Sequence, residues 1–181
     1  MLDTITNACG YYAENPSEMP NASNTRIVGL CTGLLAGSVV ASARSLSELL
    51  PLATEAVRIA FRTGTCVGAA KEALEQASSS KETWSTIVTS ISESSAKDAI
   101  DEFHQEQRTP TLAHAYISAV STMALTISGP PATTKLLLQR DAFKACARVP
   151  IPVYAPYHAA HLYSQADIDR ILDKDAIRHL Q

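Results

Sequence analysis

The chain has 181 residues, 46% of them apolar, so it is long enough to bury a core and is expected to fold as one domain with room for a small insert. Its 15 Lys and Arg against 18 Asp and Glu give a net charge of -3, and no basic run is longer than two residues. Nucleic acid and membranes are therefore excluded as predicted partners, because both are bound through concentrated positive charge.

The N-terminal segment lacks the positive and apolar regions of a secretory signal. The longest stretch of small and apolar residues, 30–43, is shorter than the roughly 20 residues that cross a bilayer. We therefore expect a soluble, cytoplasmic protein. Its four cysteines show no paired spacing and are expected to be reduced thiols: Cys9, Cys31, Cys66 and Cys146.

The first half of the chain predicts helices around a single strand. A short helical pattern is followed by turn residues up to residue 25, and β-branched residues predict a strand over 26–30. Small and apolar residues predict a buried helix over 34–43. The spacing of Leu, Ala and Ile predicts a second helix over 45–63, and a further helical stretch ends near residue 78.

The second half alternates between strand and helix patterns. Strands are predicted over 84–91, 115–121 and 124–128, helices over 95–104 and 132–143, and an extended segment over 148–153. The order β-α-β-β-α-β is that of a ferredoxin-like unit. We interpret it as an insert in a larger α/β domain.

Residues 29–33, with the sequence GLCTG, place Cys31 between two glycines where the predicted strand becomes a helix. This pattern is typical of a nucleophile elbow, in which a sharp turn strains the central residue and the flanking glycines make room. The helix start would favour the thiolate of Cys31, and the backbone N–H of Thr32 would donate to an oxyanion. The pattern alone leaves a second interpretation open, a small buried cysteine at a tight turn.

A thiol nucleophile needs a general base, and the histidines are the candidates. His158 follows the last extended segment, at a strand end, where α/β folds place catalytic groups, although taken alone it also fits an exposed loop residue. His104 and His114 flank predicted elements and are expected at the surface, and His179 lies near the C-terminus. His158 and His161 have the spacing of half a metal site, but without a second cluster no metal site is predicted.

Four ordered segments resemble one known family. They are GLCTGLL at 29–35, EAVRIAFR at 55–62, ISGPP at 127–131 and YAPYHAAHLY at 154–163. Together they are similar to the starter-unit acyl-carrier-protein transacylase (SAT) domain of fungal non-reducing polyketide synthases. The resemblance covers most of this chain but only the middle of the family's domain, whose opening strand and loop, with a second oxyanion donor, and closing elements have no counterpart here.

The resemblance implies a partial α/β-hydrolase-like large subdomain over residues 1–82 and 154–181, with a ferredoxin-like small subdomain over 83–153. It also implies a catalytic dyad, whose cysteine falls on Cys31 and whose histidine falls on His158. Arg62 matches an arginine that pairs with the substrate carboxylate in malonyl-using relatives. A helix-surface ion pair is the alternative for Arg62.

The implied reaction takes a starter acyl group from acyl-CoA, or from a carrier protein of a donor fatty acid synthase, onto Cys31. The acyl group then passes to the phosphopantetheine thiol of an acyl carrier protein. A thiol suits this reaction because each step exchanges one thioester for another, and no bound cofactor is implied because CoA and phosphopantetheine enter with the substrates. Two alternatives stay open: a truncated, inactive relic with at most a carrier-protein binding role, and a cysteine thioesterase.

Overall fold

A computed structural model of the chain describes residues 2–21, 23, 25–74 and 82–173. It divides into two compact units, Met1–Gly64 with Arg170–Gln181, and Thr65–Asp169. The subdomain boundaries implied by the resemblance differ from these units and stay a prediction. Within the described residues, no helix is long and apolar enough to span a membrane.

The first unit is built from helices α1 (Leu2–Glu14), α2 (Thr32–Ser42) and the first part of α3 (Leu46–Leu74), with a short 3-10 helix at Pro16–Glu18. Their shared core consists mostly of small apolar side chains, which let helix backbones approach closely: Ile5, Ala36, Val39, Ala43, Leu49, Ala53 and Ala56. The predicted helices over 34–43 and 45–63 are confirmed. The first of them is less buried than predicted, because α2 buries only two of its residues.

The predicted strand over 26–30 is not formed. These residues are irregular, and Val28 and Leu30 are 95% and 89% exposed. A strand is stabilised by backbone hydrogen bonds to a neighbouring strand, and the described part of the first unit contains none. The prediction of a strand over 26–30 is therefore wrong, because its β-branched residues have no neighbouring strand to pair with among the described residues.

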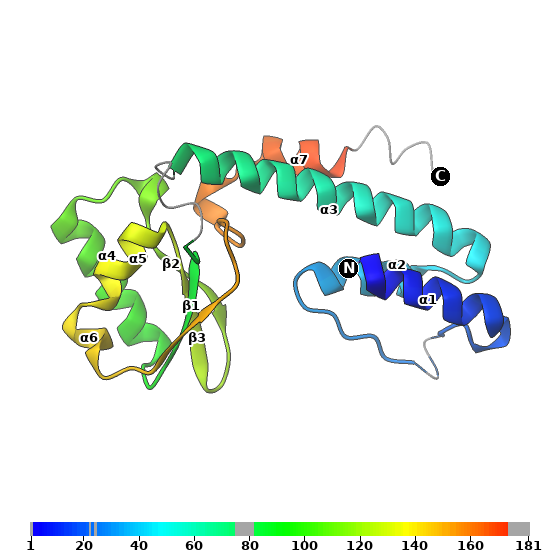
Figure 1. Cartoon of the computed structure of the whole chain (residues 1–181), viewed down its shortest axis with the longest axis horizontal. Coiled ribbons are helices and arrows are strands. Elements are labelled where there is room, and N and C mark those ends of the chain that lie inside the picture. The colour runs from blue at the N-terminus through cyan, green and yellow to red at the C-terminus, as the bar shows by residue number, and fades with distance from the viewer. Residues whose placement is uncertain (1, 22, 24, 75–81, 174–181) are drawn as a thin grey trace. The chain divides into compact units, whose positions relative to one another are not determined.

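The second unit contains a four-stranded antiparallel sheet in the order β2-β3-β1-β4 (Figure 1). The strands are β1 (Ser85–Thr89), β2 (Tyr116–Val120), β3 (Ala124–Ser128) and β4 (Arg148–Ile151). The helices α4 (Glu93–Gln107), α5 (Pro131–Leu138) and α6 (Asp141–Lys144) lie on one side of it. Each strand overlaps its predicted segment, so the mixed α/β class and the predicted element order are confirmed.

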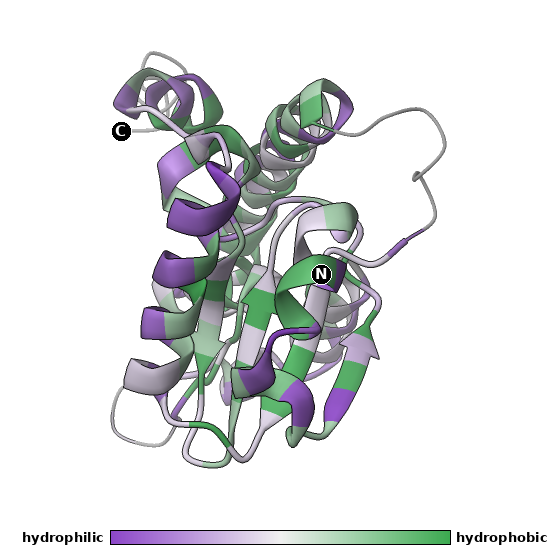
Figure 2. Cartoon of the chain, turned by 90° about the vertical axis from the view of Figure 1, so that its left-hand side faces the viewer, coloured by the Kyte–Doolittle hydropathy of each residue, from purple (hydrophilic) through white to green (hydrophobic). Residues whose placement is uncertain are grey.

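Alternating strand residues build the core of this unit. Val88, Leu125 and Ile127 are buried against apolar residues of the helices, while their neighbours in the strands face the other way. The resulting bands of hydrophobic and hydrophilic residues are visible along the strands in Figure 2. The helix α4 starts at Ser92, whose hydroxyl accepts a 3.1 Å hydrogen bond from the Ser95 amide.

The single helix predicted over 132–143 is two helices, α5 and α6. Leu137 and Phe143 are both fully buried in the same core. On a continuous helix these residues, six apart, would point about 120° away from each other. The backbone leaves the helical conformation at Arg140 (ψ 153°), which allows both side chains to face the sheet.

After β4 the chain forms a short 3-10 helix, η3 (Ala160–Leu162), and α7 (Gln165–Leu172), and a further 3-10 helix, η2 (Thr111–Ala113), precedes β2. The segment between β4 and η3 contains no regular structure but two fully buried residues, Pro156 and Ala159. Burial of these two side chains anchors the segment, which carries His158.

Candidate functional site

Cys31 occupies a strained turn at the start of α2. It is the residue that precedes the helix, with φ 54° and ψ -121°, and it is exposed. A positive φ is unfavourable for a residue with a Cβ, so the surrounding turn has to hold it. Two backbone hydrogen bonds close that turn, from the Gly33 amide to Leu30 O (2.9 Å) and from the Leu34 amide to Cys31 O (3.0 Å).

The two glycines beside Cys31 have different roles. A Cβ on Gly29 would lie 2.5 Å from Gly33 O and 2.7 Å from Leu34 N, so a side chain there collides with the backbone of the turn. A Cβ on Gly33 would meet nothing within 4 Å. The expectation that both glycines make room is therefore correct for Gly29 and wrong for Gly33, because Gly33 already lies in α2 and faces open space.

Thr32 is the first residue of α2 and is exposed. Its N–H belongs to the amides at a helix start that have no acceptor within the helix. An anion beside the Cys31 sulfur would meet the Thr32 N–H and the positive end of the helix dipole. The oxyanion role of the Thr32 N–H stays a prediction.

His158 lies in the turn between β4 and η3 and is exposed. Its φ is 59°, again the left-handed region, which few histidines adopt. Two tyrosine hydroxyls donate to the carbonyl groups just before it: Tyr116 to Tyr157 O (2.7 Å) and Tyr163 to Pro156 O (2.8 Å). No sequence pattern predicted a role for both tyrosines. Tyr163 lies in the YAPYHAAHLY segment, and this position could have indicated a role near His158. No sequence pattern marks Tyr116.

Cys31 belongs to the first unit and His158 to the second. Their pairing as a dyad therefore stays a prediction that each local geometry makes chemically reasonable. Both side chains are exposed, and both stand on turns with positive φ, which present a side chain away from the elements on either side.

Arg62 is held by acidic partners within the first unit. Its guanidinium contacts Glu55 Oε1 at 3.2 Å and Asp173 Oδ2 at 2.8 Å, and it donates to Ile171 O at 3.3 Å. Glu55 is 7% exposed and also pairs with Arg58 at 3.3 Å. These contacts favour the ion-pair alternative for Arg62, and the substrate-binding role stays a prediction.

The remaining described histidines differ from one another in burial. His104 is buried in α4, which corrects the expectation of a surface position. The same face of α4 carries Ile100 and Phe103, which pack in the apolar core beside the sheet. His104 is therefore buried with them. His114 is partly buried beside it, and His161 in η3 lies at the surface. His179 lies outside the described residues.

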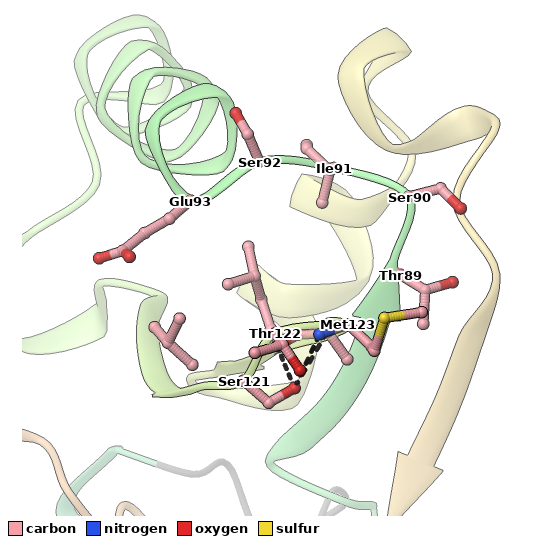
Figure 3. Close-up of a pocket in the computed structure, with 11 residues that line it drawn as sticks. Thr89, Ser90, Ile91, Ser92, Glu93, Ser121, Thr122 and Met123 are labelled. Carbon is pink, nitrogen blue, oxygen red and sulfur yellow. Dashed lines mark hydrogen bonds between the residues drawn. The ribbon is translucent and has the colours of Figure 1, made fainter.

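A groove of about 630 Å³ lies at one end of the sheet, between the β1–α4 loop and the β2–β3 hairpin (Figure 3). Its polar groups are engaged locally: the Ser121 hydroxyl accepts from the amides of Met123 (3.4 Å) and Ala124 (3.0 Å). Neither Cys31 nor His158 lines it. We interpret it as the gap between the turn of the β2–β3 hairpin and the β1–α4 loop. Among the described residues, no cluster of three or more His, Cys, Asp or Glu is arranged to hold a metal ion.

Comparison with known proteins identifies the family. The family described as "Starter unit:ACP transacylase in aflatoxin biosynthesis" matches residues 4–158. Non-reducing polyketide synthase 1 of Elsinoe fawcettii is 58% identical over 172 residues, 94% of this chain and 8% of that protein. Non-reducing polyketide synthase Preu8 of Preussia isomera is 53% identical over 167 residues, 92% of this chain and 8% of that protein.

A more distant relative, non-reducing polyketide synthase albA of Aspergillus niger, is 40% identical over 166 residues, again 92% of this chain and 8% of that protein. The chain thus spans less than a tenth of the length of these relatives. The match contains both Cys31 and His158. The chain belongs to the starter unit:ACP transacylase (SAT) family found in fungal non-reducing polyketide synthases.

Proposed function

We propose that this chain transfers a starter acyl group to an acyl carrier protein in polyketide biosynthesis, through a thioester on Cys31. The observation that carries the proposal is the exposed Cys31 at φ 54°, directly before α2, in a turn where Gly29 lies against the backbone of Gly33 and Leu34. A structural cysteine gains nothing from a strained, exposed position, whereas a nucleophile gains access and the Thr32 amide at the helix start. Membership of the SAT family gives this arrangement its reaction class.

In the proposed first half-reaction, His158 removes the proton from the Cys31 sulfur, and the thiolate attacks the carbonyl carbon of the donor thioester. The Thr32 N–H donates to the resulting oxyanion. As the carbonyl re-forms, the bond between carbon and the donor sulfur breaks, and the leaving thiolate takes the proton from His158. Acyl-CoA, or an acylated carrier of a donor fatty acid synthase, is the proposed donor.

The second half-reaction repeats these steps with the thiol of the acyl carrier protein. His158 takes the proton from the phosphopantetheine thiol, which attacks the acyl group on Cys31, and the Cys31 thiolate leaves and is reprotonated. The donor, the acyl-enzyme and the product are all thioesters and have similar free energies. Neither half-reaction therefore has to start from an intermediate that is much more stable than its product. The proposed reaction uses no bound cofactor.

The finer fold assignment is part of the same proposal. We propose that residues 83–153 form a ferredoxin-like small subdomain, which the antiparallel order β2-β3-β1-β4 supports. Residues 1–82 and 154–181 are proposed to belong to an α/β-hydrolase-like large subdomain, which the sharp turn at Cys31 supports. The partner that this assignment implies is an acyl carrier protein.

Acyl transfer can be measured directly with the purified chain, radiolabelled acetyl- or hexanoyl-CoA and a phosphopantetheinylated carrier protein. We expect label on Cys31 in a hydroxylamine-sensitive thioester, followed by label on the carrier. Cys31→Ala should abolish both, and Cys9→Ala, the other cysteine of the same unit, should leave both unchanged. His158→Ala should slow the labelling of Cys31 by about 10²-fold or more.

The same assay separates the alternatives. Release of free acid without labelled carrier would identify a thioesterase. Absence of label on Cys31 would identify an inactive relic, and carrier association that survives Cys31→Ala would assign it a binding role only. Labelling that is unchanged in Cys31→Ala would show that the assigned nucleophile is wrong.

A further inference from the structure

The turn that carries His158 is fixed by side chains from two other parts of the second unit. The Tyr116 hydroxyl, from β2, donates to Tyr157 O at 2.7 Å, and the Tyr163 hydroxyl, just after η3, donates to Pro156 O at 2.8 Å. The Tyr157 amide donates to Ala155 O at 2.8 Å within the turn. Two consecutive carbonyl groups before His158 thus accept hydrogen bonds from tyrosines.

These bonds act on the backbone of His158 itself. The carbonyl of Tyr157 and the amide of His158 belong to one planar peptide group, so fixing the direction of the carbonyl also fixes the plane from which φ of His158 is measured. That φ is 59°, a conformation that a histidine leaves readily unless its surroundings hold it. The direction in which the imidazole is presented depends on this angle.

We propose that Tyr116 and Tyr163 are positioning residues that hold the His158 turn in the conformation required for proton transfer. This inference rests on the proposed function, in which His158 is the base. The two hydroxyls act on the backbone of the turn. The ring of Tyr116 is held in turn by an edge-to-face contact with His161, at 5.1 Å between ring centroids.

Both tyrosines are suited to act as permanent donors. Burial raises the pKa of Tyr163 to about 12, and burial raises the pKa of Tyr116 further. Both hydroxyls therefore keep their protons throughout the neutral range. A phenylalanine at either position would keep the packing of the ring and remove only the hydrogen bond.

The test compares Tyr116→Phe and Tyr163→Phe with Tyr154→Phe, which removes the hydroxyl of an exposed tyrosine in the same segment. Single-turnover acylation of Cys31 by acetyl-CoA is followed over a range of acetyl-CoA concentrations. We expect each positioning variant to lower the maximal rate constant by about tenfold while the half-saturating concentration stays the same. Tyr154→Phe should match the unmodified chain.

A double-mutant cycle separates positioning from general damage to the fold. If Tyr116 acts through His158, then Tyr116→Phe adds no further loss in a His158→Ala background, because groups that act as one unit are non-additive. An equal loss in both backgrounds overturns the proposal. So does an unchanged rate in both tyrosine variants.

A second measurement is independent of activity. The three-bond coupling between the amide and α protons of His158 reports its φ, and we expect it to change in the Tyr116→Phe, Tyr163→Phe double variant but not in Tyr154→Phe. An unchanged coupling overturns the proposal even if acylation slows. If the unmodified chain forms no thioester on Cys31 while the coupling changes as expected, the proposed function fails and the turn anchoring stands.

Discussion

The imidazole rings of His104 and His114 are stacked, with their centroids 3.9 Å apart and their planes 5° apart. His104 is 7% exposed, and its Nε2 lies 3.1 Å from both the amide and the carbonyl of Ala115. Its Nδ1 is buried and has no hydrogen-bond partner among the described residues. Burial lowers the pKa of His104, and the neighbouring His114 lowers it further, against the raising effects of the Ala115 carbonyl and Asp101.

This lowered pKa predicts that acid destabilises the second unit. The unfolded chain binds a proton on His104 near pH 6.5, whereas the folded chain binds it only at lower pH. The stabilisation is therefore complete above about pH 6.5 and is lost as the pH falls toward the folded pKa, by at most about 1.4 kcal/mol per pH unit. Urea unfolding followed by the fluorescence of Trp84, the single and fully buried tryptophan, measures this slope between pH 5 and 7.

His104→Gln should flatten the pH dependence of the free energy of unfolding. His161, whose pKa burial also lowers, contributes in the same direction and would account for a residual slope. A slope that is equally steep in His104→Gln would contradict the assignment to the stacked pair.

The turn at Cys31 gives a second prediction, because a side chain should be accommodated at Gly33 but not at Gly29. Gly29→Ala places a Cβ 2.5 Å from Gly33 O, so the turn must open, at a cost of about 1–3 kcal/mol. Gly33→Ala places its Cβ in open space at the start of α2, where alanine favours the helix by up to about 1 kcal/mol. Hydrogen exchange of the α2 amides should accelerate in Gly29→Ala and slow or stay constant in Gly33→Ala. Equal effects of both variants would mean that the close approach of residues 29 and 33 is not what shapes the turn.

The sheet of the second unit was predictable because its signals are local. Strand residues alternate, and the turn residues at 121–123 and 129–131 mark where β2 and β3 end. The break between α5 and α6 was not predictable, because it depends on Leu137 and Phe143 reaching one shared core. The sequence pattern indicates helix over these residues, but it does not show that the chain has to leave the helix between Leu137 and Phe143 for both side chains to face the sheet.

In the candidate site too, features that depend on neighbouring residues in the sequence could be predicted, and features that depend on distant residues could not. The sequence placed Cys31 correctly at a strained turn, since the pattern of glycines is local. It missed the anchoring of the His158 turn by Tyr116, whose hydroxyl bonds to the carbonyl of Tyr157, 41 residues later in the chain. The burial of His104 had a local signal that was overlooked: Ala96, Ile100 and His104 are spaced four apart and share the buried face of α4.

The final prediction concerns Arg62, which has two candidate roles. Glu55 has 9% of its side chain exposed and contacts both Arg62 and Arg58. Among the described residues, removing Arg62 leaves this carboxylate with Arg58, whose side chain is 60% exposed. Arg62→Ala should therefore cost about 1–3 kcal/mol of the free energy of unfolding. Arg58→Ala should cost less than about 1 kcal/mol, because an exposed pair contributes little.

Urea unfolding followed by far-UV circular dichroism measures both variants without any acyl donor. Glu55→Gln in the Arg62→Ala background should recover part of the loss, since no unpaired carboxylate then stays buried. If Arg62→Ala unfolds like the unmodified chain, the contacts with Glu55 and Asp173 do not stabilise the first unit, and the guanidinium is free to pair with a substrate carboxylate. If the loss follows the predicted order, Arg62 is occupied by its own chain, and recognition of the starter group has to come from other residues.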